Sequence, residues 1–152
     1  QPTLKAEPID PIVIISEQPL EETVSAVEIE EYVEDTLLPR EDIELIALVT
    51  MAEADGECEE GKRLVIDTIL NRVDSVYFPD NVHDVVYQKH QFSSMWNGRI
   101  DKCIVDEDIC QLVEEELKSR TNSNTIFFTA GGYGKYGTPM FRLGNHYFSS
   151  YE

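Results

Sequence analysis

The stretch that decides the fold is EDIELIALVTMAEADGE, residues 41–57, which carries one glutamate near the end of an apolar segment and another just past a glycine. The density and spacing of its apolar residues predict a mostly buried helix over 41–54. Asp55-Gly56 is a pair that commonly ends a helix. Glu53 is therefore expected in the last helical turn, and Glu57 beyond the helix.

Glu53 is suited to acid catalysis at such a position. The carbonyl end of a helix disfavours a negative charge, and apolar neighbours withdraw water, so both effects favour the protonated carboxyl. A protonated glutamate can give its proton to a leaving oxygen. Most glutamates at helix ends are solvated, however, and residues 52–57 alone leave that alternative open.

The rest of the chain predicts further helices, a small amount of strand and a glycine-rich loop. Helices are expected over 59–73, 81–87 and 106–120, strands over 125–129 and 140–147, and a flexible loop over 131–137. In the helix 106–120 we expect Glu114, Glu115 and Glu116 to be largely solvated. Asn71-Arg72, near the end of the second helix, is expected to cap and orient other groups.

Composition limits the possible partners. The formal net charge is −18, and residues 1–39 hold ten acids against Lys5 alone, so nothing resembles a nucleic-acid-binding stripe or a patch for anionic membranes. The longest aliphatic run near the start, residues 12–15, is far short of the roughly twenty residues of a membrane span. The chain begins at Gln1 without a signal peptide, which we interpret as a mature or trimmed product.

Residues 1–40 are expected to form an acidic arm or linker, because five prolines interrupt any periodicity there. A short acidic helix over 21–38 is an alternative for part of it. The arm is either a spacer or a segment that packs on the domain and covers a groove. The domain itself is expected over 41–152.

Several blocks in order resemble the cell wall hydrolase family that includes the spore-cortex-lytic enzymes. The blocks are 52-AEADGE-57, 60-EGK-62, 69-ILNRV-73, 78-FP-79, 85-VVYQ-88, 91-QFS-93 and 144-GNHYF-148, and the resemblance covers roughly residues 41–150. It implies an α+β, lysozyme-like fold with a mainly helical core and a small antiparallel sheet. It also implies cleavage of the β-1,4 bond after N-acetylmuramic acid in peptidoglycan, outside the cytoplasm.

In related lytic transglycosylases a single glutamate serves as acid and then as base, and the muramic C6 hydroxyl attacks to give a 1,6-anhydro product. Glu53 matches that role. Glu57 is expected to be structural or auxiliary, with a second catalytic carboxylate as the alternative, since hydrolysing glycosidases use such pairs.

Candidate substrate-binding groups follow the two carboxylates along the sequence. Amides, a hydroxyl and an indole in 91-QFS-93 and 95-MWNG-98 suit sugar hydroxyls and sugar faces, with Gln91 and Trp96 facing a groove and Phe92 packing. The full set of substrate-binding candidates is Gln91, Phe92, Trp96, Tyr133, Tyr136, Asn145 and His146. Tyr133 and Tyr136 are included because aromatics in a glycine-rich loop are not easily explained as core.

No metal or other cofactor is expected. His83, His90, His146 and Glu53 lack compact ligand spacing, and a hydrogen-bonded structural role fits His146 better than metal binding. The three cysteines, Cys58, Cys103 and Cys110, match no metal or disulfide framework, so buried free thiols are expected, with a Cys103–Cys110 bond as the alternative.

Three functions remain open from the sequence. The leading one is a monomeric lytic transglycosylase whose partner is the peptidoglycan glycan strand. The others are a muramidase-type hydrolase, on peptidoglycan or on another β-linked amino sugar polymer, and a non-catalytic glycan-binding or regulatory domain. The strong acidity motivates the non-catalytic alternative, because an anionic protein gains no general attraction to an anionic wall.

Overall fold

The computed structural model describes residues 38–89 and 91–152. The helices are α2 (Arg40–Ala54), α3 (Glu59–Asp74), α4 (Val82–Val86) and α5 (Glu107–Lys118), with two 3-10 turns, η1 (Ser93–Met95) and η2 (Ile100–Lys102). All four helices that the sequence predicts within this range are confirmed; the 3-10 turns were not predicted. Residues 1–37, which hold most of the predicted arm and of its alternative helix, are not among the described residues. The boundary between arm and domain therefore stays a prediction.

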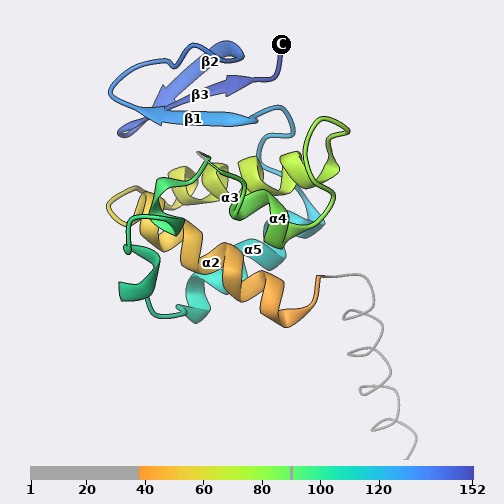
Figure 1. Cartoon of the computed structure of the whole chain (residues 1–152), viewed down its shortest axis with the longest axis vertical. Coiled ribbons are helices and arrows are strands. Elements are labelled where there is room, and N and C mark those ends of the chain that lie inside the picture. The colour runs from red at the N-terminus through yellow and green to blue at the C-terminus, as the bar shows by residue number, and fades with distance from the viewer. Residues whose placement is uncertain (1–37, 90) are drawn as a thin grey trace, which may run out of the picture. The chain divides into compact units, whose positions relative to one another are not determined.

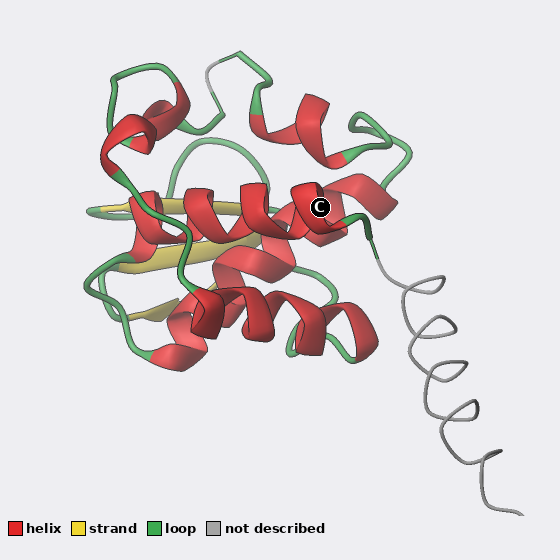
Figure 2. Cartoon of the chain, turned by 90° about the horizontal axis from the view of Figure 1, so that it is seen from below, coloured by secondary structure: helices red, strands yellow, loops and turns green. Residues whose placement is uncertain are grey.

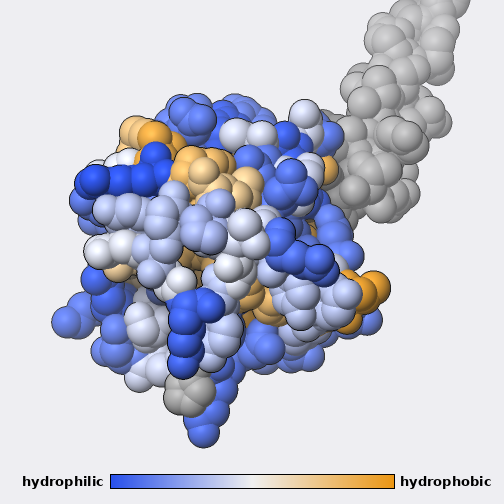
Figure 3. All heavy atoms as spheres, turned by 90° about the horizontal axis from the view of Figure 1, so that it is seen from above, coloured by the Kyte–Doolittle hydropathy of each residue, from blue (hydrophilic) through white to orange (hydrophobic). Residues whose placement is uncertain are grey.

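The helices pack against one another and a small sheet covers one side of them, with α3 next to the sheet and α2 and α5 farther from it (Figures 1 and 2). The strands are β1 (Phe127–Ala130), β2 (Thr138–Leu143) and β3 (His146–Ser150), in the order β1-β3-β2 and antiparallel throughout. This architecture confirms the expected α+β class with a helical core and a small antiparallel sheet. Seen from the sheet side, the surface is mostly hydrophilic and its apolar atoms gather in separate patches (Figure 3).

The expectation of a single strand over 140–147 is wrong. The segment is a hairpin, in which β2 ends at Leu143 and β3 begins at His146. Gly144 takes a φ of 61°, the left-handed region that glycine enters without strain, and this permits the tight turn between the strands.

The core is built where the apolar faces of the helices meet. α2 ends at Ala54, as the Asp55-Gly56 pair predicts, and contributes Ile46 and Val49 to the interior. Asn81 caps α4 by accepting a 2.8 Å hydrogen bond from the backbone N–H of Asp84. Buried side chains from all four helices join Phe92, Ile126 and Phe148 in one core, so the sheet packs directly on the helices.

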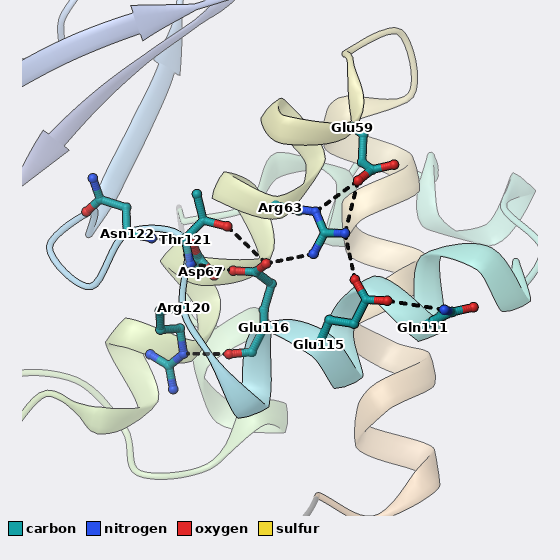
Figure 4. Close-up of polar contacts among 9 residues, drawn as sticks. All are labelled: Glu59, Arg63, Asp67, Gln111, Glu115, Glu116, Arg120, Thr121 and Asn122. Atoms are coloured by element: carbon teal, nitrogen blue, oxygen red, sulfur yellow. Dashed lines mark hydrogen bonds and ion pairs between the residues drawn. The ribbon is translucent and has the colours of Figure 1, made fainter.

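The expectation that Glu114, Glu115 and Glu116 are all solvated is wrong for Glu116, which is 2% exposed. Its Oε2 accepts a 2.9 Å hydrogen bond from Arg63 Nη1 on α3. Its Oε1 accepts a second, of 2.7 Å, from the backbone N–H of Thr121 (Figure 4). Burial is tolerated because several donors surround this carboxylate.

Asp67, also on α3, supplies another of these donors. Its Oδ2 accepts from the backbone N–H of Asn122 at 2.9 Å, whereas its buried Oδ1 meets no donor among the described residues. The Asp67 carboxyl lies within hydrogen-bond reach of the Glu116 carboxylate. Two carboxyl groups can bond to each other only if one is protonated. Burial, and then the hydrogen bond to Glu116, raise the pKa of Asp67 to about 8. Burial alone would raise the pKa of Glu116, but hydrogen bonds from Asp67, Thr121 and Arg63 outweigh it and hold that pKa low. The proton therefore belongs to Asp67.

The cysteines form no disulfide. Cys58 is exposed, Cys103 is partly exposed and Cys110 is buried, and all three are free thiols, so the Cys103–Cys110 alternative is wrong. Of the three, only Cys110 fits the expectation of a buried thiol. Within the described part of the chain, every helix falls short of the length and apolar content that a membrane span requires.

Candidate active site

A cavity of about 680 Å³ lies where the end of α2 meets the segment after α4 and one edge of the sheet. The described residues that line it are Glu53, Lys89, Gln91, Ser93, Trp96, Asn97, Phe128, Thr129, Ala130 and His146. The set combines a carboxyl, amides, hydroxyls, an indole and an imidazole. A cavity of this size with an apolar wall and a few convergent polar groups is the usual form of a small-ligand or saccharide site.

Glu53 sits in the last turn of α2 and is partly buried, as the sequence predicts. Its Oε2 accepts a 3.3 Å hydrogen bond from the backbone N–H of Ser94, at the start of the 3-10 turn η1. This bond ties the carboxyl to the facing wall. Glu53 is the only carboxylate among the described residues that line the cavity.

Glu57 is not among the residues that line the cavity and is bound to the β2–β3 turn. Its two carboxylate oxygens accept hydrogen bonds of 3.1 Å from the backbone N–H and the side-chain amide of Asn145. A side chain at position 144 would collide with Glu57 Oε1, so the glycine there also serves this contact. The structure therefore pairs two sequence candidates, Glu57 and Asn145, with each other and leaves both outside the cavity lining.

Gln91 lines the cavity and is held from behind by Arg72 of α3. Arg72 Nη1 donates a 2.7 Å hydrogen bond to Gln91 Oε1, and Arg72 Nε donates a 2.8 Å bond to the carbonyl of Ile126, just before β1. One arginine thus connects two walls of the cavity. The orienting role expected of Arg72 matches this geometry, whereas the C-cap of α3 is Ser75.

Trp96 and Phe92 divide as expected between cavity and core. Trp96 lines the cavity, is 59% exposed and meets the ring of Tyr87 edge-on at 6.4 Å between centroids. Phe92 is 1% exposed and packs near Phe128, with ring centroids 5.9 Å apart. Phe92 therefore supports the cavity wall and does not line it.

His146 begins β3 and lines the cavity, although it is only 7% exposed. Its ring lies 4.9 Å from that of Phe128, and its Nδ1 is buried without a hydrogen-bond partner among the described residues. The buried hydroxyl of Ser94 likewise lacks one. Unsatisfied polar groups are rare in protein interiors, and one of these two belongs to His146, which borders the cavity.

Tyr133 and Tyr136 are exposed, but neither lines the cavity. Tyr133 packs edge-on against Tyr147 at 5.1 Å, and Tyr136 lies 6.3 Å from the ring of Phe127. Their expected contacts with saccharide stay predictions.

Four lining residues were not candidates in the sequence: Lys89, Phe128, Thr129 and Ala130. Phe128, Thr129 and Ala130 belong to β1, and the alternation of a short strand does not tell which of its ends borders a cavity. Ser93 and Asn97 lie in the two segments that the sequence analysis identified by their sugar-binding groups. For Lys89 the sequence carried no signal.

No three His, Cys, Asp or Glu side chains in residues 38–89 and 91–152 are grouped so that they could hold a metal ion. His83 lies on α4, where it contacts Asp84, and His90 falls outside the described residues.

Comparison with known proteins finds one matching family and several similar sequences. The family model described as Cell Wall Hydrolase matches residues 56–149, a stretch that begins three residues after Glu53. A spore cortex-lytic enzyme of Halalkalibacterium halodurans is 34% identical over 113 residues, which cover 70% of this chain and 34% of that protein. One of Oceanobacillus iheyensis is 41% identical over 59 residues, 39% of this chain and 21% of that protein. The chain thus spans about a third or less of these relatives.

Two solved structures share the fold. The catalytic domain of the Bacillus cereus SleB protein superposes with a TM-score of 0.67 at 24% identity, covering 75% of this chain and 93% of that domain. The catalytic domain of the germination-specific lytic transglycosylase SleB from Bacillus anthracis gives a TM-score of 0.66 at 24% identity, covering 74% and 97%. The fold expected from the family resemblance is therefore confirmed.

Proposed function

This chain belongs to the cell wall hydrolase family, and from that premise we propose that it cleaves peptidoglycan as a lytic transglycosylase. The bond broken is the β-1,4 bond between N-acetylmuramic acid and N-acetylglucosamine. The chain acts outside the cytoplasm, as a monomer, on glycan strands. The names of its relatives, spore cortex-lytic enzymes, support this substrate class.

The observation that carries the proposal is that the described residues bring a single carboxylate, that of Glu53, to the cavity. Glycosidases that hydrolyse with two carboxylates need the second one across the scissile bond, about 5 to 9.5 Å from the first, as nucleophile or as base. Glu57, the nearest sequence candidate, is engaged by Asn145 outside the cavity lining. A transglycosylase needs no second carboxylate, because the substrate supplies its own nucleophile.

The proposed reaction uses Glu53 twice. Its carboxyl donates a proton to the glycosidic oxygen as the bond to the muramic C1 breaks, which releases the 4-hydroxyl of the next sugar. The C6 hydroxyl of the muramic residue then attacks C1, and Glu53 takes the proton of that hydroxyl. Glu53 returns to its starting state, and no water is consumed. The bond from Ser94 N–H holds the carboxyl in place through both steps.

The acidity of the chain does not oppose this proposal at the site itself. Besides Glu53, the only titratable side chains among the described lining residues are the basic Lys89 and His146, so the excess of acids in a chain of net charge −18 does not extend to the cavity. The exposed ring of Trp96 offers a face for a sugar. A cavity with an exposed indole and no excess of acids supports glycan binding in spite of the anionic surface.

The test is the product of digestion. Purified cortex and vegetative peptidoglycan are digested side by side, and the masses of the muramic ends are measured. We expect 1,6-anhydro ends, lighter by one water than reducing ends, and we expect Glu57→Gln to give the same product. Reducing ends would overturn transglycosylation in favour of hydrolysis, and binding to sacculi without cleavage would favour the non-catalytic alternative.

A further inference from the structure

Arg72 is a buried cation with no anionic partner among the described residues. It is 3% exposed, and no carboxylate in residues 38–89 and 91–152 lies within ion-pair distance of its guanidinium. Its hydrogen bonds go to neutral oxygens, the carbonyl of Ile126 and the amide oxygen of Gln91. An unpaired buried charge is costly, so its presence beside the cavity calls for a physical explanation.

Aromatic rings compensate for part of this cost. The guanidinium carbon lies 5.0 Å from the ring centroid of Phe78, 5.1 Å from that of Phe92 and 5.4 Å from that of Phe127. Such contacts stabilise a desolvated cation. Burial lowers the pKa of Arg72 to about 10, so the side chain keeps its charge at neutral pH. A charged guanidinium is thus held rigidly behind the cavity wall.

The hydrogen bond from Arg72 fixes the orientation of the side-chain amide of Gln91. Arginine carries only donors, so the atom of Gln91 that faces it must be the amide oxygen and not the nitrogen. The side-chain nitrogen of Gln91 makes no hydrogen bond to another described residue, and Gln91 borders the cavity. Gln91 therefore presents a donor to a ligand while its acceptor is already occupied.

We propose that Arg72 is a positioning residue that holds Gln91 as a hydrogen-bond donor, and that this donor selects amino sugars whose nitrogen is acetylated. An N-acetyl group offers a strong acceptor, its carbonyl oxygen. A de-N-acetylated sugar offers an ammonium at the same place, a donor to which the amide nitrogen of Gln91 cannot hydrogen-bond. This inference rests on the proposed function and names the substrate class of that same cavity.

The test measures binding in the Glu53→Gln background, so that cleavage does not disturb it. The probes are a β-1,4-linked GlcNAc–MurNAc tetrasaccharide and its de-N-acetylated counterpart, titrated by calorimetry. Gln91→Glu exchanges the donor for an acceptor while its carboxylate pairs with Arg72. We expect affinity for the acetylated probe to fall about tenfold or more, preference over the de-N-acetylated probe to shrink, and the melting temperature not to fall. Gln111→Glu, an exposed glutamine on α5, is the matched control and leaves affinity unchanged.

A double-mutant cycle separates positioning from a merely structural role. Arg72→Lys loses the planar fork that holds Gln91, so we expect it to weaken binding several-fold when Gln91 is present. In a Gln91→Ala background the same change should leave affinity unaltered, although it lowers the melting temperature equally in both backgrounds.

The outcomes distinguish the two proposals. Equal losses of affinity in both backgrounds, or tight binding by Gln91→Glu, would overturn this inference alone. A Glu53→Gln parent that binds neither probe would overturn the proposed function and this inference with it.

Discussion

Two buried polar groups on the same helix, five residues apart, have opposite environments. Asp67 of α3 keeps its proton beside Glu116 of α5. Glu116 in turn accepts hydrogen bonds from Arg63 and Thr121 (Figure 4). Arg72 lies behind the cavity wall, where neutral oxygens and aromatic rings surround a charge that no acid of the described residues pairs with. Asp67, Glu116 and Arg63 form what we call the closed cluster, because their polar groups bond to one another and to neighbouring residues. The polar groups around Arg72, in contrast, leave donors and acceptors free.

The difference indicates what each region does. Fully satisfied polar networks stabilise a particular packing and have nothing left to offer a ligand. Several polar groups around the cavity have free hydrogen-bonding capacity in the part of the chain that the structure describes: Glu53, the amide nitrogen of Gln91, the Nδ1 of His146 and the hydroxyl of Ser94. Substitutions at the cavity should therefore change catalysis and spare stability, and substitutions in the closed cluster should do the reverse.

The strongest test of this division is Glu53→Gln. We expect cleavage of peptidoglycan to fall by about 10²–10⁴-fold, because an amide cannot donate the proton that the leaving oxygen needs. The melting temperature should stay within about a degree of the parent, since among the described residues only Ser94 donates a hydrogen bond to this carboxyl. Full activity of the variant, measured by release of soluble muropeptides, would remove Glu53 from the mechanism.

The converse test is Glu116→Gln in the closed cluster. An amide nitrogen cannot accept from Arg63 or Thr121, so the free energy of unfolding should fall by about 3 kcal/mol in urea denaturation. Binding of the tetrasaccharide below the transition should not change. Glu115→Gln, at an exposed neighbour that also pairs with Arg63, is the control and should cost much less. A comparable loss in both variants would contradict the distinction between buried and exposed acids.

Asp67→Asn probes the proton in the cluster. The native state keeps that proton up to about pH 8, whereas an unfolded chain releases it near pH 4, so through this group the stability of the parent falls as the pH rises from about 4 to about 8. Asparagine donates to Glu116 without titrating, and this part of the pH dependence should disappear. Urea denaturation of both proteins at about pH 5 and about pH 9 measures it. A slope that survives in the variant would assign the proton elsewhere.

Gly144→Ala has the smallest expected effect on stability and activity. It tests whether Glu57 has a structural role, like the closed cluster, or takes part in the reaction. A left-handed φ and a collision with Glu57 should cost about 1–3 kcal/mol and loosen the bond to Asn145. Gly56→Ala is the control, because a Cβ there meets open space. Product chemistry should be the same in both variants. A change from anhydro to reducing ends in Gly144→Ala would instead give Glu57 a part in the reaction.

The parts of the structure that were predictable are those that local sequence controls. The end of α2 and the cap of α4 follow from residues within one turn, so Asp55-Gly56 and Asn81 indicate them directly. The turn at Gly144-Asn145 had a local signal too, a glycine followed by asparagine inside a strand pattern, and the sequence analysis missed it.

The burial of Glu116 was not predictable in the same way. It depends on Arg63, which lies 53 positions earlier in the chain. The link between Arg72 and Gln91 spans 19 positions. Nothing in a local pattern indicates such partners, because packing between helices brings them together. The candidate site was accordingly predicted at Glu53, Gln91, Trp96 and His146, but not at the strand β1 that forms its other wall.

The exposed indole at the cavity also makes the protein its own reporter. Trp96 is the single tryptophan of the chain, so all of its indole fluorescence arises beside Glu53. A sugar that stacks on this ring would exclude water from it and shift the emission towards the blue. Occupancy of the site can therefore be followed in real time by the intrinsic fluorescence of the unlabelled protein.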